Sequence, residues 1–199
     1  MPSNTATQKA LFLFDGPNFY KNLKNGKINK GHLNFRKLAE NLSMGRTIVD
    51  VVFFTSPVDQ STDAVNYKNQ QKFFAVLAKS GVTLRKGNLV TRRVSCKNCH
   101  TDPIICKICD TPLVVKEEKS VDVQMAMTMV TCCMKNEFDV LYLGSCDSDL
   151  VPAINFVRDY GKQVFLLLPL NAKGYAVGAA CNTIICIDQP KVNAAQNIY

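Results

Sequence analysis

Short apolar runs alternate with amphipathic segments along the chain, and this alternation predicts strands and helices in turn. The apolar runs typical of strands span 10–15, 46–57, 82–87, 138–144, 162–169 and 183–188. The segments between them have helical periodicity, polar caps or a closing glycine, at 19–26, 34–42, 61–81, 121–136, 148–161 and 174–181. Strands that alternate with helices imply a mostly parallel sheet covered on both faces. We therefore expect an α/β fold.

One segment interrupts this alternation. Between 88 and 119, two arms flank a tip that is rich in cysteine. We expect a single domain over residues 1–199, in which residues 88–118 form an inserted hairpin. The tail at 189–199 is polar, and we expect it to be loosely held. A chain of 199 residues can bury a core without the help of disulfides.

The cysteines of the tip have the spacing C-x2-C-x6-C-x2-C, formed by Cys96, Cys99, Cys106 and Cys109. Two such pairs can supply the four thiolates of a tetrahedral, structural Zn²⁺ site, and the ion would stabilise so short a segment. A redox-active C-x-x-C pair, or cysteines without a metal, are the alternatives. His100 could replace one ligand, although we expect it to face solvent.

The remaining cysteines lie in apolar contexts, where we expect them in the core: Cys132, Cys133, Cys146, Cys181 and Cys186. The first residues lack the apolar segment of a signal peptide, and no apolar run approaches the ~20 residues that cross a bilayer. Nine cysteines without a signal peptide indicate a reducing compartment. We therefore expect a cytoplasmic protein with no membrane partner.

The net charge of +8 changes the picture, because it favours an anionic partner such as nucleic acid. Basic residues gather on the arms and tip of the insert and just before it. Those that we take as candidates for nucleic-acid binding are Arg85, Lys86, Arg92, Arg93, Lys97 and Lys119, with Lys107 beside them. They either contact phosphates or form an ordinary solvated face.

Acidic residues stand where predicted strands end or helices begin. Asp15 ends the first strand and Asp147 follows 138–144, whereas Asp149 and Asp122 open helices. In an open parallel sheet, the first strand usually lies beside the strand that starts the second half, and ligands bind there. If these strands are neighbours, all four carboxylates face one mouth. Carboxylates that repel one another favour a cation, and oxygen ligands suit Mg²⁺ or Mn²⁺.

Each of these acids also has a local explanation. Asp15 could bond the turn that follows it, and Ser148 could cap a helix that has Asp149 in its first turn. Asp122 could play the same part after Ser120. Because all of these acids fall at one predicted edge of the sheet, the metal site is the interpretation that we favour.

Three segments together resemble a known family: "LFLFDGPNFY", "KSVDVQMAMTMV" and "FDVLYLGSCDSDLVPAINFVRDYGKQVFLL". They are similar to the NYN domain, in its LabA-like (DUF88) branch of the PIN-like nuclease group. The resemblance covers most of the chain outside the cysteine insert. It implies a PIN-like, Rossmann-like three-layer sandwich and a divalent-metal-dependent ribonuclease activity.

The family's functional residues can be matched one by one. The resemblance implies catalytic or metal-binding roles for Asp15, Asn18, Asp122, Asp147 and Asp149, with Lys119 as the lysine of the K-G-V-D-type motif that contains Asp122. The family often has another acid six residues after the one matched by Asp122. In this chain that position is Thr128, and its lack of a carboxylate weakens the expected metal site.

Two functions of different classes follow. The first is an RNA phosphodiesterase that uses Mg²⁺ or Mn²⁺ and acts on single strands or loops, with the zinc insert guiding the RNA. The second is a catalytically weak or inactive module that binds RNA or protein, or a second copy of the chain, through the insert. A phosphatase with a D-x-D motif fits poorly, because Asp15 is followed by Gly-Pro-Asn.

Overall fold

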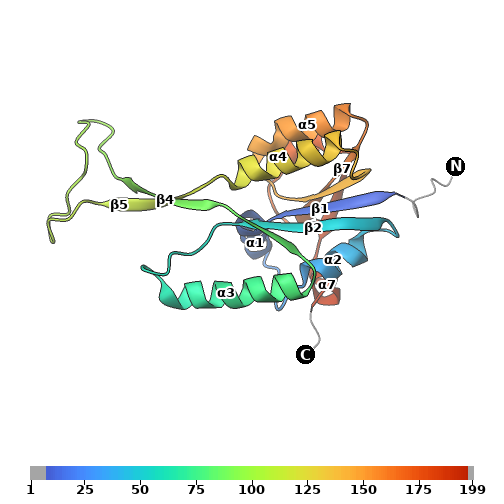
Figure 1. Cartoon of the computed structure of the whole chain (residues 1–199), viewed down its shortest axis with the longest axis horizontal. Helices are drawn as coiled ribbons and strands as arrows, with labels where there is room; N and C mark the ends of the chain where they lie inside the picture. The colour runs from blue at the N-terminus through green and yellow to red at the C-terminus, as the bar shows by residue number, and fades with distance from the viewer. Residues whose placement is uncertain (1–7, 197–199) are drawn as a thin grey trace.

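The computed structural model describes residues 8–196, which form a central six-stranded sheet and a projecting hairpin (Figure 1). The order in the central sheet is β3-β2-β1-β6-β7-β8, and all of its pairings are parallel. Its strands are β1 (Lys9–Asp15), β2 (Thr47–Thr55), β3 (Thr83–Lys86), β6 (Val140–Gly144), β7 (Gln163–Pro169) and β8 (Thr183–Ile187). The predicted α/β fold with a mostly parallel sheet is confirmed.

Helices cover both faces of this sheet and complete three layers (Figure 1). One face packs against α1 (Gly16–Asn25), α2 (Phe35–Leu42), α3 (Ala64–Lys79) and α7 (Gln189–Ala194). The other packs against α4 (Val121–Met134), α5 (Val151–Asp159) and α6 (Tyr175–Ala180).

The central strands are apolar throughout because both of their faces are buried. In β1, Phe12 and Phe14 point to the α1 side, whereas Leu11 and Leu13 point to the α4 side. Successive side chains of a strand point to opposite faces, so a strand between two helical layers needs no polar alternation. Truncating Phe12 to alanine in this packing would cost about 3–5 kcal/mol.

Four helices begin with an acidic or amide side chain that accepts a backbone N–H of the first turn. Asp15 caps α1, Asn34 caps α2, Asp63 caps α3 and Asp188 caps α7. Each cap satisfies a donor that the helix itself leaves open and contributes about 1 kcal/mol. The helix boundaries are therefore fixed by the sequence itself.

Two predicted segments differ from the structure. The helix expected at 148–161 is divided into a 3₁₀ turn, η2 (Ser148–Leu150), and α5, which has a proline in its first turn. The tail expected to be loose instead forms α7, because Val192 and Ala195 are buried against the core. Of that tail, 197–199 lie outside the described residues.

The interrupting segment is an antiparallel hairpin of β4 (Asn88–Arg93) and β5 (Val114–Lys119), which projects from the body (Figure 1). It leaves the sheet at Gly87, where an added Cβ would lie 2.7 Å from the Lys119 carbonyl oxygen. It returns directly to α4 through Ser120, which has a positive φ of 79°. The base of the hairpin is thus held closely against the start of α4.

In the part of the chain that the structure covers, no helix combines the length and the apolar character that crossing a membrane requires.

Candidate functional site

The candidate site lies at the carboxyl ends of β1 and β6, which are neighbours in the sheet. Phe14 is paired with Gly144, so the residues that follow each strand emerge side by side. This is the point where the strand order reverses, and open parallel sheets bind ligands at such a switch point. Gly144 is required there, because an added Cβ would lie 2.6 Å from the ring of Phe14. The sequence-based prediction that these two strands are neighbours is confirmed.

Ser145 connects the two strand ends. Its buried hydroxyl donates to Asp15 Oδ2 at 3.1 Å and accepts the Asp147 N–H at 3.2 Å. The other oxygen of Asp15 accepts the Asn18 N–H at 3.1 Å. The structure therefore brings Asp15 and Asp147 to the two sides of one serine. Sequence reasoning did not single out Ser145, although it lies in the quoted segment "GSCDSD".

Asn18 ties the first turn of α1 to the end of β6. Its side-chain oxygen accepts the Cys146 N–H at 3.1 Å and the Asn22 amide at 2.7 Å. Because the backbone group of Cys146 is a donor, the atom that it meets must be the amide oxygen. Asn18 thereby fixes the distance between the two strand ends and directs its amide nitrogen elsewhere.

The carboxyl of Asp15 is buried in an electronegative environment. Burial raises its pKa from 3.8 to about 6, its hydrogen bonds to Asn18 and Ser145 lower it, and the charges of Asp122 and Glu118 raise it. At neutral pH the ionised form of Asp15 is destabilised by burial and by the neighbouring negative charges. A cation bound beside it would offset this destabilisation.

Two further acids face the same place. Burial raises the pKa of Asp122, and the charges of Asp147 and Asp149 raise it further. Burial also raises the pKa of Glu118, with Asp122 adding to the effect. The Ser56 hydroxyl lies near enough to Glu118 to oppose this shift, although it forms no hydrogen bond of normal geometry with a described residue.

We call this group the carboxylate edge; its members are Asp15, Glu118, Asp122, Asp147 and Asp149. Sequence reasoning missed Glu118. The signal that could have found it is strand alternation, since successive side chains of β5 point to opposite faces. Glu117 pairs with Arg92 and Lys119 on the hairpin, so its neighbour must point the other way.

The carboxylate edge suits a hard divalent cation by its chemistry. Its five acidic side chains offer only oxygen atoms as ligands. Lys119 follows Glu118 in the sequence, but it forms a salt bridge with Glu117 rather than with a member of the carboxylate edge. Within residues 8–196, however, no three acidic, histidine or cysteine side chains lie close enough together to surround one ion. Mg²⁺ fits such an open site, because it retains several waters and binds through one or two carboxylates.

Two of these acids also cap a helical turn, a role that does not exclude metal binding. Asp15 caps α1, and Asp147 caps η2 by accepting the Asp149 N–H at 2.9 Å. Ser148 is therefore not the cap that we considered from the sequence. Ser120 precedes α4 without a side-chain cap. A cap leaves the second carboxylate oxygen of Asp147 for other partners.

Thr128 lies away from the carboxylate edge. It is six residues beyond Asp122, about 9 Å along the axis of α4 at 1.5 Å per residue. Its hydroxyl donates to the Gln124 carbonyl at 2.7 Å, and its side chain lines a cavity with Arg85 and with Lys9, which starts β1. Thr128 therefore lies near the amino-terminal end of β1, whereas the carboxylate edge lies at the carboxyl ends of the strands.

The cysteine pairs occupy two separate loops of the same design, which we call the Cys turns (96–101 and 106–111). In each, the first cysteine donates its N–H to the threonine carbonyl at 2.9 Å, and the residue after the second cysteine has a positive φ. The four thiols do not surround a common point, since no three lie close enough among the described residues. A repeat, Cys-Lys-x-Cys-x-Thr, underlies both turns and was not recognised from the sequence.

The second thiol of each Cys turn is disposed to ionise. The Thr101 hydroxyl, 3.1 Å from Cys99 Sγ, is the main cause that lowers the pKa of Cys99 from 9.0 to about 7. Thr111 is the main cause that lowers the pKa of Cys109 in the same way. Thiolates are the form of cysteine that binds metals, so this chemistry fits Zn²⁺. His100 is exposed, as expected.

The basic residues proposed from the sequence lie in several different environments. Glu117 is paired with Arg92 at 3.2 Å and with Lys119 at 3.3 Å, which offsets part of their charge. Lys86 lies over the ring of Phe74, and Arg85 lines the cavity beside Thr128. Arg92, Arg93 and Lys97 line another cavity together with Asp102 and Glu117. The hairpin is thus basic but interspersed with acids.

The five cysteines outside the Cys turns were expected in the core, and they differ in how deeply they are buried. Cys133 is buried, and Cys132, Cys146 and Cys181 are partly buried. Cys186 is exposed, because β8 is the edge strand of the sheet and its side chain faces outward. The expectation that all five lie in the core is wrong for this residue.

We compared the chain with solved structures, curated proteins and models of protein families. A solved structure with a similar fold is that of VPA0982, a protein of unknown function from Vibrio parahaemolyticus RIMD 2210633. The TM-score is 0.63 at 14% identity, and the match covers 94% of this chain and 97% of that one. Among curated proteins, none matches the chain significantly. The family model of the NYN domain matches residues 9–188, and the chain therefore belongs to the NYN domain family, which has a nuclease-like fold.

Proposed function

We propose that this protein is a divalent-metal-dependent ribonuclease that hydrolyses RNA phosphodiester bonds at the carboxylate edge. The observation that carries the proposal is the Ser145 bridge: its hydroxyl donates to the Asp15 carboxylate and accepts the backbone N–H of Asp147, which ties the segment after β6 to the end of β1. The finer family assignment, to the LabA-like (DUF88) branch of PIN-like nucleases, rests on the three quoted sequence segments and belongs to the same proposal.

In this proposal Asp15, Asp122, Asp147 and Asp149 hold Mg²⁺ or Mn²⁺, either directly or through water. Such a cation, when bound, lowers the pKa of a water ligand and polarises the phosphodiester. Asn18 orients a substrate oxygen through its amide nitrogen, since its oxygen already bonds Cys146 and Asn22. Glu118 adds a carboxylate that could accept a proton, because burial already raises its pKa.

We further propose that Cys96, Cys99, Cys106 and Cys109 bind a structural Zn²⁺. The lowered thiol pKa values of the Cys turns support this, and the reducing cytoplasm, which we propose as the location, would keep them as thiols. One ion shared by all four requires the two turns to fold toward each other. Arg93 and Lys97 are the residues by which the hairpin would then guide RNA.

The test is cleavage of a labelled single-stranded RNA in Mn²⁺ and in EDTA, by the unaltered protein and by Asp147→Asn. Asparagine still caps η2, so the fold should persist. We expect Mn²⁺-dependent cutting that Asp147→Asn reduces at least about 100-fold, the effect of losing several kcal/mol of charge stabilisation. Asp159→Asn, at the exposed end of α5, is the matched control. Equal cutting by all three proteins would indicate a contaminating nuclease.

A second function is supported by a separate observation. The hairpin exposes apolar side chains, and Ile108 in the second Cys turn is 96% exposed. Together with Thr128 and the open arrangement of the acids, this favours a module that binds RNA, a protein or another copy of the chain without turnover. RNA binding in EDTA with no cleavage in Mn²⁺ would select it.

A further inference from the structure

One of two long acid-free basic stretches in the sequence covers α1, the loop after it and the first residues of α2; the other runs from 64 to 101. From Gly16 to Ala39 the chain contains six lysines and arginines and neither aspartate nor glutamate. By contrast, from Asn88 to Lys119 four acids accompany six basic residues. A field of one sign attracts a polyanion more strongly than a mixed surface does.

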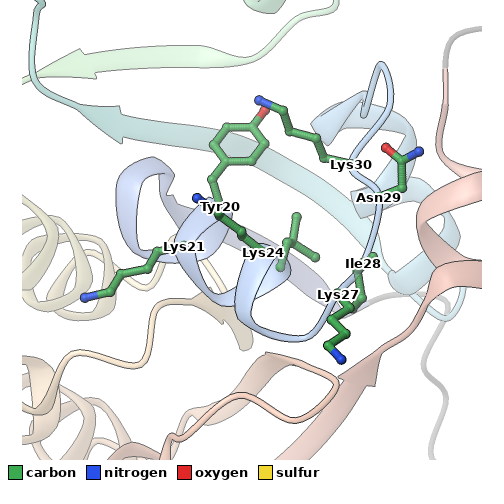
Figure 2. Close-up of a pocket in the computed structure, with 8 residues that line it drawn as sticks. Tyr20, Lys21, Lys24, Lys27, Ile28, Asn29 and Lys30 are labelled. Atoms are coloured by element: carbon green, nitrogen blue, oxygen red, sulfur yellow. The ribbon is translucent and has the colours of Figure 1, made fainter.

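Four of these lysines surround a cavity of about 580 Å³ beside α1: Lys21, Lys24, Lys27 and Lys30. Figure 2 shows Tyr20 and Lys30 on one side of it and Lys27 on the other. A second cavity, of about 350 Å³, shares Tyr20 and Lys30 and continues to Lys72 on α3. We call the two cavities together the basic groove; no acidic residue lines either one.

The lysines of the groove are exposed, and their charge is not offset by ion pairs. Among the residues from 8 to 196, no acidic side chain forms a salt bridge with Lys21, Lys24, Lys27 or Lys30. Their ammonium groups therefore remain available to an anion. An unpaired surface lysine is common, but four around one cavity concentrate positive charge that could neutralise the phosphates of a nucleic acid.

The floor of the groove is rigid and partly aromatic. Leu23 and Ile28 are buried beneath it. The ring of Tyr20 packs against Phe35 and Phe73, and the ammonium of Lys30 lies 4.6 Å from its centroid. Proteins that bind single-stranded nucleic acid combine such a positive groove with aromatic side chains.

The groove lies beside α1, the helix that Asp15 of the candidate site caps. Asn18 is in the first turn of α1, and Lys21 follows one turn later on the same face, about 4.5 Å further along the axis. The end of α1 packs against the loop that follows β7, since a Cβ at Gly26 would lie 2.2 Å from the Leu170 carbonyl oxygen. An RNA strand that follows α1 toward its first turn would therefore reach Asp15, which caps that helix.

We propose that the basic groove binds the phosphate backbone of single-stranded RNA and directs it to the carboxylate edge. This inference rests on the proposed function, because it names the surface that holds that substrate. It moves the main contact from the hairpin, where sequence reasoning placed it, to α1 and the loop after it.

The test measures binding of a short fluorescein-labelled oligouridylate by fluorescence anisotropy in EDTA, over a range of salt concentrations. Lys24→Gln/Lys27→Gln/Lys30→Gln should lower the slope of log affinity against log salt by about 2, at about 0.7 per lost phosphate contact. At about 0.1 M salt this corresponds to roughly 100-fold weaker binding. The matched control is Lys68→Gln/Lys79→Gln/Lys135→Gln, which changes exposed lysines elsewhere and should leave the slope unaltered.

An unchanged slope in the groove variant, with circular dichroism showing a folded protein, would overturn the inference. So would an equal loss in the control variant. Vesicles containing phosphatidylserine and a polyglutamate peptide serve as competing anions, and tighter binding of either than of RNA would also overturn it. Because binding is measured without cleavage, groove-dependent binding with no nuclease activity would refute the proposed function alone. Cleavage that persists while the groove variant binds normally would refute only the groove.

Discussion

The carboxylate edge takes its side chains from β1, β5, α4 and the segment after β6, whereas each Cys turn takes its thiols from one short loop. The first group is held by strand pairing and buried packing, so its geometry depends on the whole fold. The second is held by local hydrogen bonds to threonine, at the end of a projecting hairpin. Carboxylates from distant positions are brought together against their mutual repulsion, while the thiols are disposed to ionise by their own neighbours.

Asp15 offers the largest expected effect, because its pKa is raised from 3.8 to about 6. The folded protein holds this proton more tightly than the unfolded chain, so stability falls as pH rises from about 4 to about 6 and stays lower above that. Asp15→Asn removes the charge and keeps a capping oxygen. It should raise the free energy of unfolding above about pH 7 by up to about 3 kcal/mol, at 1.36 kcal/mol per pKa unit.

Urea denaturation near pH 4 and near pH 8 measures this effect, and the gain should appear only at the higher pH. Asp159→Asn should show no such dependence. A gain of equal size at both values would mean that the carboxylate edge is not electrostatically strained.

Glu118 belongs to the hairpin in sequence, but its charge reaches Asp15 at the carboxylate edge, so it tests whether the two regions are separate. Glu118→Gln removes a charge that raises the pKa of Asp15. If Glu118 supports the cation, the Mn²⁺ concentration for half-maximal cleavage should rise about tenfold, as for other residues that orient metal ligands. Glu117→Gln, its neighbour on the opposite face, is the matched control and should change it less than about twofold. Equal effects of both changes would assign the loss to the hairpin as a whole.

Zinc removal should have the smallest effect on the body of the protein. We expect one ion per chain by elemental analysis, lost in Cys99→Ser and retained in Cys186→Ser, an exposed cysteine outside the Cys turns. Proteolysis should then cut within the hairpin, while the Tm of the body shifts by no more than about 2 °C, as for ordinary surface substitutions. Zinc content that is the same in both variants would remove the Cys turns from consideration as a metal site.

Much of this could be predicted because it depends on local patterns. Apolar strands between helical layers require a parallel sheet, and the reversal of strand order places Asp15 beside Asp147. The exceptions have physical reasons. The tail becomes α7 because Val192 finds a place in the core, which no periodicity in so short a segment indicates. The sequence also did not reveal that Glu117 pairs with two of the basic candidates on the hairpin, Arg92 and Lys119, which leaves their proposed role in binding nucleic acid a prediction.

The sequence by itself determined the order of elements and the two C-x-x-C pairs, since each of these is encoded within a few neighbouring residues. Only the tertiary structure decided that Glu118 approaches Asp15, that the four thiols lie in separate turns, and that lysines of α1 and α3 share one groove. Those relations depend on how distant segments pack, and packing is set by the summed contacts of the core rather than by any single stretch of chain.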